Sequence, residues 1–415
     1  MHDRNKNDRL EDAMEKYSYN SHFSKHWRLG RFFHNKYNDL VIADTFRLIA
    51  LSMFSIFIPI FLIRDAGYSI LDICFFEIAS FFAVIILYYF TLKYLISTGV
   101  KRILIISYLL NIVFLLILYF FDTLISDFGR FAFLSMVYFF GIVPCVFYWS
   151  AHHVYFLDSI RSADEGKKLG IMTAIPTIMG IASPFIGSIL ITQAGFKGVF
   201  IISAALMVVA SGALFFSSDI KIKLNLNFEK IIDLKNMKKN MTYAIQGIGY
   251  TATGLIWPLF LFFISIKLIS MGFLYLFSNI ASAVTYYFVG SKTDKPGSKN
   301  LGRIGAVGHG LFLILRAIFE TILAMTAFQI MGGIFSGVLN TALDSNFFKR
   351  SHNDIGNAIM NRELYMYVGK IFFVSIFIVG LIFMNIIGAL VLTLIMAGVI
   401  ILTLNIVIKY EEWSN

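Results

Sequence analysis

The sequence predicts an all-α polytopic membrane protein with twelve transmembrane helices, and composition is the first reason. Hydrophobic residues make up 58% of the chain and charged residues 14%, whereas soluble domains carry about 25% charged residues. The second reason is the length of the apolar runs, because a helix needs roughly 20 apolar residues to cross a bilayer core. Lipid is therefore the expected surroundings of most of this chain.

The apolar runs fall into two groups of six between charged or glycine-rich connectors. The first group lies at residues 40–63, 70–92, 103–121, 129–157, 168–192 and 196–216. The second lies at residues 241–264, 268–289, 303–320, 322–348, 357–380 and 386–408. We therefore predict a basic N-terminal tail (1–39), a six-helix bundle (40–216), a connector (217–240), a second six-helix bundle (241–408) and a C-terminal tail (409–415).

The distribution of lysine and arginine predicts the orientation of the chain. Positively charged connectors stay in the cytoplasm, and here the connectors after the second, fourth, sixth, eighth and tenth helices are basic. The N-terminal tail is basic too, and it lacks the apolar core of a cleavable signal peptide. We expect both termini in the cytosol and a multi-pass protein of the cytoplasmic (inner) membrane.

Charge and cysteine content argue against several other classes. The formal net charge of +10 is spread over short connectors, so we expect no nucleic-acid partner. Cys74 and Cys145 lie in apolar runs, without the spacing of a disulfide framework or a zinc site. We expect no metal, no cofactor and a monomeric chain.

The most specific motif follows the eighth predicted helix. It reads Gly290-Ser-Lys-Thr-Asp294-Lys295-Pro-Gly297-Ser-Lys299, and it resembles the Gly-x-x-x-Asp-Arg/Lys-x-Gly-x-Lys/Arg loop of the major facilitator superfamily. Glycines allow a tight turn, and an aspartate with basic residues can bind helix ends in one conformation and release them in another. The resemblance implies a conformational latch; the alternative is an ordinary cytosolic turn.

The equivalent loop after the second helix, residues 93–102, matches only in part. It keeps Gly99 and a basic end but has Ile96 where the family pattern has Asp. Gly99 and Gly297 recur at similar places in the two halves, as Gly166 and Gly356 do, which favours two homologous halves. The resemblance extends over residues 40–410 and implies the major facilitator fold.

The predicted fifth helix matches a sequence motif of transporters only in part. Gly170, Pro184 and Gly187 partly match the fifth-helix motif of drug and proton antiporters, while Met179, Ser183 and Ser188 replace expected glycines. Small residues and prolines are also ordinary packing and bending devices in membrane helices.

Ionisable residues inside the predicted helices are functional candidates because an unpaired charge in hydrocarbon is costly. Lys370 lies near the middle of the eleventh helix, and Glu77 lies about two turns inside the second. We interpret them as a coupling or substrate site, with a structural ion pair as the alternative.

Polar residues on the helices that the resemblance assigns to the central cavity are the next candidates. On the fourth helix these are Trp149, His152, His153 and Asp158; on the tenth, Asn340 and Asp344; on the seventh, Gln246, Tyr250, Thr253 and Trp257. Histidine exchanges a proton near neutral pH, and residues three or four apart share a helix face. The alternatives are polar packing at the cytosolic rim and hydrogen bonding between helices.

A metal site is a poorer interpretation of the histidines, because adjacent residues project about 100° apart on a helix. Two further sets of charges lie near helix ends. Asp44 and Arg47, like Arg362 and Glu363, are expected to close the inner gate or to pair with each other. Arg316 and Glu320, one turn apart, are expected to form a salt bridge.

The resemblance implies a transporter that moves a small solute by alternating access, not an enzyme. The chain has no Gly-x-x-x-x-Gly-Lys-Ser/Thr sequence, so we expect an ion gradient, of protons, as the energy source. Candidate protonation sites are Glu77, His152, His153 and Asp344. Efflux of amphipathic compounds is favoured. The alternatives are a nutrient uptake symporter, a uniporter, a receptor or lipid-handling protein, or a membrane-embedded enzyme that uses His152, His153 and Asp158.

Overall fold

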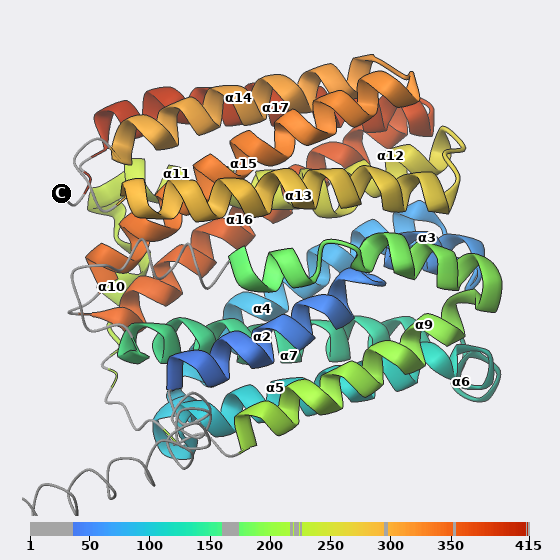
Figure 1. The fold of residues 1–415 in the computed structure, drawn as a ribbon, viewed down its shortest axis with the longest axis horizontal. Coiled ribbons are helices and arrows are strands. Elements are labelled where there is room, and N and C mark those ends of the chain that lie inside the picture. The colour runs from blue at the N-terminus through green and yellow to red at the C-terminus, as the bar shows by residue number, and fades with distance from the viewer. Residues whose placement is uncertain are drawn as a thin grey trace, which may run out of the picture.

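The computed structural model describes residues 36–159, 174–215, 219, 224, 226–293, 298–351, 354–411 and 413. Every regular element within these ranges is a helix, as the composition predicts. A helix satisfies all its backbone hydrogen bonds internally, which an apolar solvent requires. Figure 1 shows the helices running roughly parallel to one another along the long axis of the molecule.

The elements of the N-terminal half are α2 (Lys36–Ser52), η1 (Ser55–Phe57), α3 (Ile58–Arg64), α4 (Ile70–Thr98), α5 (Val100–Tyr119), α6 (Phe121–Phe128), α7 (Arg130–Ser159) and α9 (Ser183–Phe215). Residues 174–179 are also helical. The predicted second helix ends later than expected, so that a single residue, Gly99, separates α4 from α5; its φ of 97° is one that glycine adopts without strain.

The elements of the C-terminal half are α10 (Phe228–Ile232), η2 (Leu234–Asn236), α11 (Met237–Thr251), the π-helix η3 (Ala252–Ile256), α12 (Trp257–Phe263), α13 (Leu268–Thr293), α14 (Ser298–Ile318), α15 (Ile322–Ser351), α16 (Ile355–Phe383) and α17 (Ile386–Tyr410). The predicted seventh helix is therefore built from α11, η3 and α12 in series. The first predicted helix is similarly divided into α2 and α3.

Eleven helices in the described part of the chain are long and apolar enough to cross a membrane. One of them, Ala174–Phe215, has 42 residues, about twice the length that a bilayer core requires. Gly195 interrupts it with φ 70° and ψ 179°, and Figure 1 shows the ribbon of α9 reversing direction. The all-helical, multi-pass character of the prediction is confirmed.

The helices form two groups, one from each half of the chain. In Figure 1 the blue-to-green helices lie below the yellow-to-red ones. Within the first group α5 packs against α7 and α9; within the second, α14 packs against α15 and α17. The two groups meet where α4 packs against α16 and where α9 packs against α13. These two helix pairs form the most extensive contact between the halves.

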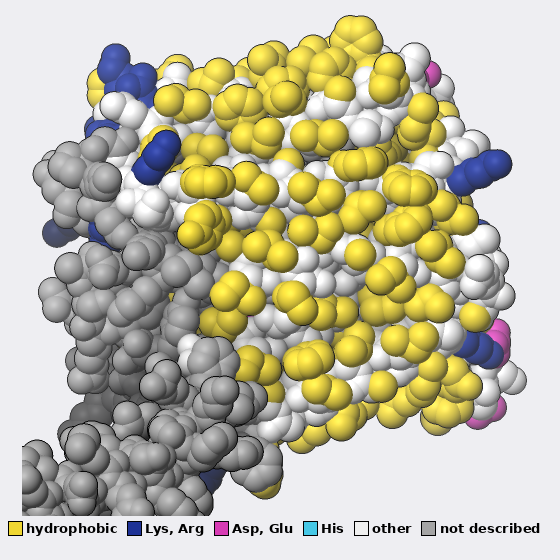
Figure 2. Space-filling view, viewed as in Figure 1, with side chains coloured by type: hydrophobic (Ala, Val, Ile, Leu, Met, Phe, Trp, Pro, Cys, Tyr) yellow, Lys and Arg dark blue, Asp and Glu magenta, His cyan; other side chains and the backbone are white. Residues whose placement is uncertain are grey.

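The surface has the pattern of a protein surrounded by lipid. Figure 2 shows hydrophobic side chains over the whole middle of one face, with lysine and arginine only at its two ends. On α4, for example, Phe75, Phe82, Ile86 and Phe90 are all more than half exposed. We call the end that carries α10 and the C-terminus the connector end, and the end that carries α6 and α12 the distal end.

Glycines allow helices of the same half to approach one another backbone to backbone, and three of them, Gly187, Gly247 and Gly369, are examples. A Cβ atom at Gly187 would overlap the carbonyl oxygen of Met53, which joins α9 to the end of α2. In the other half, a Cβ at Gly247 or Gly369 would overlap a carbonyl oxygen on the facing helix, α16 or α11. Small residues that let membrane helices approach closely are typical of such interfaces.

Candidate functional site

A buried polar cluster lies between α2, α5 and α7 in the N-terminal half. The Asp44 carboxylate accepts a hydrogen bond from the Tyr148 hydroxyl at 2.7 Å and a longer one from Tyr108 at 3.4 Å. Its other oxygen lies 2.9 Å from His152 Nε2. Asp44 and His152 are both buried. We call Asp44, Tyr108, Tyr148 and His152 the Asp44 cluster.

Helix geometry explains why α7 supplies two members of this cluster. Tyr148 and His152 are four residues apart and therefore share one face. Arg47, three residues after Asp44, lies with its Cζ atom 3.3 Å from the centre of the Tyr148 ring, a cation–π contact. Among the described residues Asp44 and Arg47 form no salt bridge with each other, so their expected mutual pairing is wrong; the Asp44 carboxylate is turned towards α7 instead.

His153 lies in a different environment from its neighbour. Its ring is 5.6 Å from the ring of Phe347 and 5.6 Å from that of Phe348, both on α15. Phe156, one turn further along α7, lies 4.6 Å from Phe348. These four residues, which we call the aromatic closure, join one helix of each half towards the connector end. His153 thus belongs to a contact between halves.

Three ionisable side chains meet where α4 packs against α16. Glu77 on α4 and Glu363 on α16 both interact electrostatically with Lys370 on α16. Lys370 Nζ lies 4.0 Å from the centre of the Tyr367 ring and 5.6 Å from that of Phe81. We call Glu77, Glu363 and Lys370 the interface charge array.

The array brings together the two leading sequence candidates, Glu77 and Lys370, and adds a third. Glu363 and Lys370 are seven residues, about two helical turns, apart and so share a face of α16. No salt bridge joins Lys370 to a carboxylate within the described residues. Lys370 thus lies against aromatic rings and interacts electrostatically with a carboxylate from each half.

Asp344 pairs with Arg362 across α15 and α16. Asp344 Oδ1 is 2.5 Å from Arg362 Nη2, and the Arg362 side chain is 6% exposed. The Arg362 guanidinium also lies 4.6 Å from the ring centre of Phe347, a member of the aromatic closure. Arg362 and Glu363 point to different partners, because adjacent residues project about 100° apart on a helix. Their expected pairing with each other is therefore wrong.

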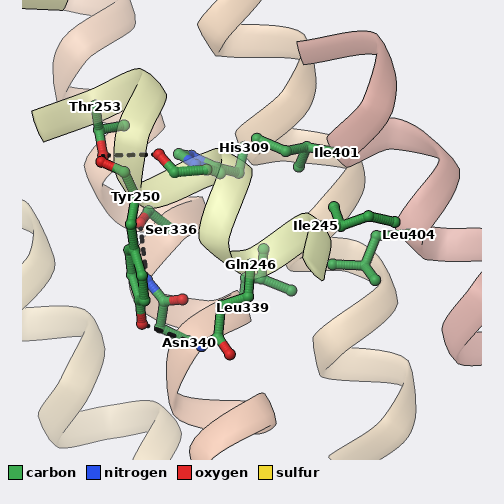
Figure 3. A pocket seen from close by; sticks show the side chains of 11 residues that line it. Ile245, Gln246, Tyr250, Thr253, His309, Ser336, Leu339, Asn340, Ile401 and Leu404 are labelled. Atoms are coloured by element: carbon green, nitrogen blue, oxygen red, sulfur yellow. Dashed lines mark hydrogen bonds between the residues drawn. The ribbon is translucent and has the colours of Figure 1, made fainter. Parts of the chain in front are cut away.

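A small cavity lies inside the C-terminal half. Figure 3 shows Gln246, Tyr250, Ser336 and Asn340 around it, with His309 on a further side. Gln246 Nε2 donates to the Tyr250 hydroxyl at 3.0 Å, and Asn340 Nδ2 donates to Ser336 Oγ at 3.2 Å. The cavity measures about 20 Å³, which is room for about one water molecule. Both polar and aliphatic side chains line it, and it is too small for an organic solute.

Trp257, expected on the same stripe as Gln246 and Tyr250, does not line this cavity. Its ring is fully buried and lies 4.5 Å from Arg316 Cζ. The π-helix η3 separates Tyr250 from Trp257 and contains an extra residue per turn, which rotates the rest of the helix. Pro258 contributes to this, because it has no N–H to donate to the preceding turn.

Arg316 and Glu320 do not form the expected salt bridge. Arg316 Nη1 donates to Gln329 Oε1 on α15. Helix α14 ends at Ile318, so Glu320 is not held one helical turn from Arg316 and is exposed. That prediction is wrong because it assumed a helix two residues longer than the one that forms.

The latch-like loop is described only at its edges. Gly290 ends the membrane part of α13, where its carbonyl accepts a hydrogen bond from Thr293. Lys299 Nζ donates to the backbone carbonyl of Glu411 at 2.6 Å. Asp294, Lys295 and Gly297 lie outside the described residues, as does the side chain of Asp158.

Sequence reasoning missed two acidic residues that tie helix ends together at the connector end. Glu411, after α17, is 5% exposed; its carboxylate lies 2.8 Å from Arg350 Nη1 and accepts from Thr242 at 2.9 Å. Asp219, after α9, accepts from the backbone N–H of Lys101 at 3.0 Å. Asp219 follows α9, the last helix of its half, and contacts α5. Glu411 follows α17, the last helix of the other half, and contacts α11, α14 and α15. We call these two residues the acidic clasps. Asp219 lies in the polar connector and Glu411 in the C-terminal tail, where no motif or helical spacing in the sequence distinguishes them from other polar residues.

The described residues contain no group of three or more His, Cys, Asp and Glu side chains that could hold a metal ion. His152 faces Asp44, and His153 lies among phenylalanines. The two histidines therefore do not converge on one point.

Comparison with known proteins gives one match. The family model described as Major Facilitator Superfamily matches residues 40–362, which is well over half of the chain. No curated protein matches the chain significantly.

Proposed function

The chain belongs to the major facilitator superfamily, and from that premise we propose that it carries a small solute across the membrane by alternating access. In this mechanism two bundles rock about a site at their interface, which opens to each side in turn. The chain is thus a membrane transporter, and its solute, coupling ion and direction are the subject of the proposal.

The proposed architecture has twelve crossings. Residues 174–215, interrupted at Gly195, would cross twice, giving six helices in residues 40–216 and six in residues 241–408. Residues 217–240 would connect the bundles, and the tails at 1–39 and 409–415 would lie with them in the cytosol. The basic connectors support this orientation in the cytoplasmic membrane.

The interface charge array is the observation that carries the proposal. It lies where α4 meets α16, one helix from each half, so a solute held there would contact both bundles at once. Lys370 and Glu77 offer both signs of charge, and Phe81 and Tyr367 offer aromatic surface. Amphipathic organic molecules match such a lining, in which a few polar groups lie among apolar and aromatic ones.

The Asp44 cluster is our candidate for proton coupling. Histidine gains and loses a proton near neutral pH, and His152 Nε2 lies 2.9 Å from a carboxylate oxygen of Asp44. His152 adjoins His153 of the aromatic closure, so a change at the cluster would act on the contact that joins α7 to α15. We propose the aromatic closure as the inner gate.

Efflux of amphipathic compounds driven by protons is the form of transport that we favour. It is supported by the aromatic surroundings of the array and by the partial antiporter motif around Pro184 and Gly187. Uptake of a nutrient by symport, or uniport, is the second candidate and uses the same site.

The test is solute-dependent proton flux in proteoliposomes that contain a trapped pH-sensitive dye. The panel includes fluorescent amphipathic cations, sugars and amino acids, and the variants are Glu77→Gln and Lys370→Met. We expect proton flux on adding amphipathic compounds to the intact chain, and at least a tenfold loss in both variants. Lys235→Gln, an exposed lysine of the connector, is the matched control and should transport normally.

Two outcomes would contradict parts of the proposal. Undiminished flux in both variants would remove the interface charge array from the solute site. Solute movement without proton movement, in folded and correctly oriented protein, would establish uniport and remove proton coupling.

A further inference from the structure

Arg316 is a buried guanidinium with too few partners. It lies in the last turn of α14 and is 3% exposed. One nitrogen, Nη1, donates to the amide oxygen of Gln329. Its Nε and Nη2 atoms are buried and have no hydrogen-bond partner within the described part of the chain. Two of its donor groups are therefore unused.

A third unused donor lies beside them. Trp257 is fully buried, its ring is 4.5 Å from Arg316 Cζ, and its Nε1–H has no partner among the described residues. Tyr275, which interacts electrostatically with Arg316, donates its hydroxyl hydrogen to the carbonyl of Thr253 at 3.4 Å. Within the described part of the chain, Arg316 and Trp257 thus present several N–H groups and have no carboxylate paired with them.

Comparison with Arg362 shows what is missing. Both guanidinium groups are buried and both lie against an aromatic ring, but Arg362 has the Asp344 carboxylate at 2.5 Å. No carboxylate within the described residues forms a salt bridge with Arg316, and Glu320 is exposed beyond the end of α14. Arginine does not deprotonate in proteins, and a buried charge without a counter-charge is strongly unfavourable.

We infer that a small anion of halide size binds between α12, α14 and α15, held by Arg316 Nε and Nη2 and by Trp257 Nε1. A single water molecule would accept hydrogen bonds but would leave the positive charge uncompensated. A spherical anion does both, and it needs only donors around it. The close packing of Arg316, Trp257 and Gln329, each at most 5% exposed, favours a monatomic anion over a carboxylate or a phosphate.

The site is separate from the interface charge array, because Trp257, Arg316 and Gln329 lie on α12, α14 and α15, whereas the array lies on α4 and α16. It lies about two helical turns along α14 from His309, which lines the small cavity. The inference does not depend on the proposed transport function, and it holds for any activity of the chain.

Thermal unfolding of the purified full-length chain tests the inference, with chloride and bromide as probes. Sodium gluconate at equal ionic strength is the reference, since gluconate is too large for the site. A ligand that binds only the folded state raises the unfolding temperature in a saturable way. We expect a saturable rise of about 3 °C with either halide in the intact chain, on the usual relation between stability and unfolding temperature.

Two variants, Arg316→Gln and Trp257→Phe, identify the site, and Arg64→Gln is the control. Arg316→Gln should remove the halide-dependent rise, whereas Arg64→Gln, which alters an exposed arginine near the distal end, should keep it. Trp257→Phe retains the guanidinium and removes one donor, so the halide concentration at half-effect should increase severalfold. A rise that persists in Arg316→Gln, or no saturable rise in the intact chain, would overturn the inference.

Anomalous diffraction from crystals of the intact chain grown in bromide decides the matter if Arg316→Gln does not fold. A bromide peak at hydrogen-bond distance from Arg316 Nε and Nη2 is the expected result. Ordered density there without an anomalous signal would identify water and overturn the inference.

Discussion

The two halves of the molecule hold an aspartate inside the helix bundle in different ways, Asp44 buried and Asp344 with its side chain 28% exposed. In the N-terminal half, Asp44 is surrounded by two tyrosine hydroxyls and the imidazole of His152. In the C-terminal half, Asp344 is paired with the guanidinium of Arg362. Imidazole changes its charge near neutral pH, whereas guanidinium does not. We propose that the first arrangement responds to protons, whereas the second is an ion pair whose cation keeps its charge.

Both arrangements reach the aromatic closure, but through different contacts. His152 adjoins His153 along α7, and Arg362 lies over the ring of Phe347 on α15. The aromatic closure is therefore in contact with His152 on α7, whose charge we expect to vary with pH, and with Arg362 on α16, whose charge is constant. We expect protons to act on the aromatic closure through the N-terminal half, and the following predictions separate the two sides.

The largest expected effect is on coupling. Asp44→Asn removes the negative charge beside His152 and replaces one of the two carboxylate oxygens by a donor, so transport driven by a pH gradient should fall at least about 100-fold, which is about 2.7 kcal/mol in the coupled step. Solute exchange at equal pH on both sides should persist. Tracer uptake into proteoliposomes, with and without the gradient, measures both.

Tyr148→Phe is the matched control for this change, because it removes one donor and leaves the Asp44 carboxylate and His152 in place. It should keep coupled transport within about threefold, as expected for the loss of one hydrogen bond. If Asp44→Asn transports normally under a pH gradient, the proton-responsive side is not the Asp44 cluster.

The next effect is on stability. Asp344→Asn leaves Arg362 buried without a carboxylate, which should lower the free energy of unfolding by about 2.5 kcal/mol, somewhat less than for a fully buried pair because the Asp344 side chain is 28% exposed. Asp122→Asn is the control, since its salt bridge with Lys197 is largely exposed and should contribute less than about 1 kcal/mol. Denaturant unfolding in detergent measures both. Equal losses in the two variants would mean that the C-terminal pair is not a fixed structural element.

Much of the fold could be predicted because the lipid environment imposes long apolar runs. The runs identified the membrane helices, and the depth of Glu77 and Lys370 identified two residues that interact electrostatically where α4 packs against α16. The partnership of Asp44 with His152 could not be predicted, because the residues are 108 positions apart and depend on how α2 packs against α7. Trp257 was expected on the face of Gln246 and Tyr250, but the π-helix before it turns it away. Arg316 was expected to pair with Glu320, but α14 ends at Ile318.

Close helix contacts give a third comparison between the halves. Gly187 supports one backbone contact in the N-terminal half, whereas Gly247 and Gly369 support a reciprocal pair in the C-terminal half. Alanine at any of the three should destabilise the protein by about 2 kcal/mol, because the added methyl overlaps a backbone carbonyl. The unfolding free energy in detergent measures this.

Gly212→Ala is the matched control for these substitutions. A Cβ at Gly212 meets nothing within 4 Å, and alanine is favoured over glycine in a helix by about 0.5–1 kcal/mol, so this variant should be stabilised. Destabilisation equal to that of Gly247→Ala would show that close approach is not the cause.

The smallest effect concerns the acidic clasps. Glu411→Gln weakens a buried bond to Arg350 and should cost about 1.5 kcal/mol. Asp219→Asn, whose side chain is 27% exposed, should cost about 0.5 kcal/mol. Thermal unfolding of the two variants measures the difference. A larger loss for Asp219→Asn would reverse the expected ranking of the clasps.

The π-helix at Ala252–Ile256 makes the length of the chain, and not only its composition, a determinant of which side chains face which partners. The π-turn accommodates one residue more than a regular helical turn, so deleting one residue from this segment would let α11 and α12 form one continuous α-helix while the side chains on either side keep their present directions. Trp257 would then stay against Arg316. Regular α-helical hydrogen bonding at the present chain length would instead turn Trp257 by about 100° towards the face of Gln246 and Tyr250. A single codon lost here would therefore be tolerated, whereas the same loss elsewhere in a membrane helix would turn every later side chain away from its partner.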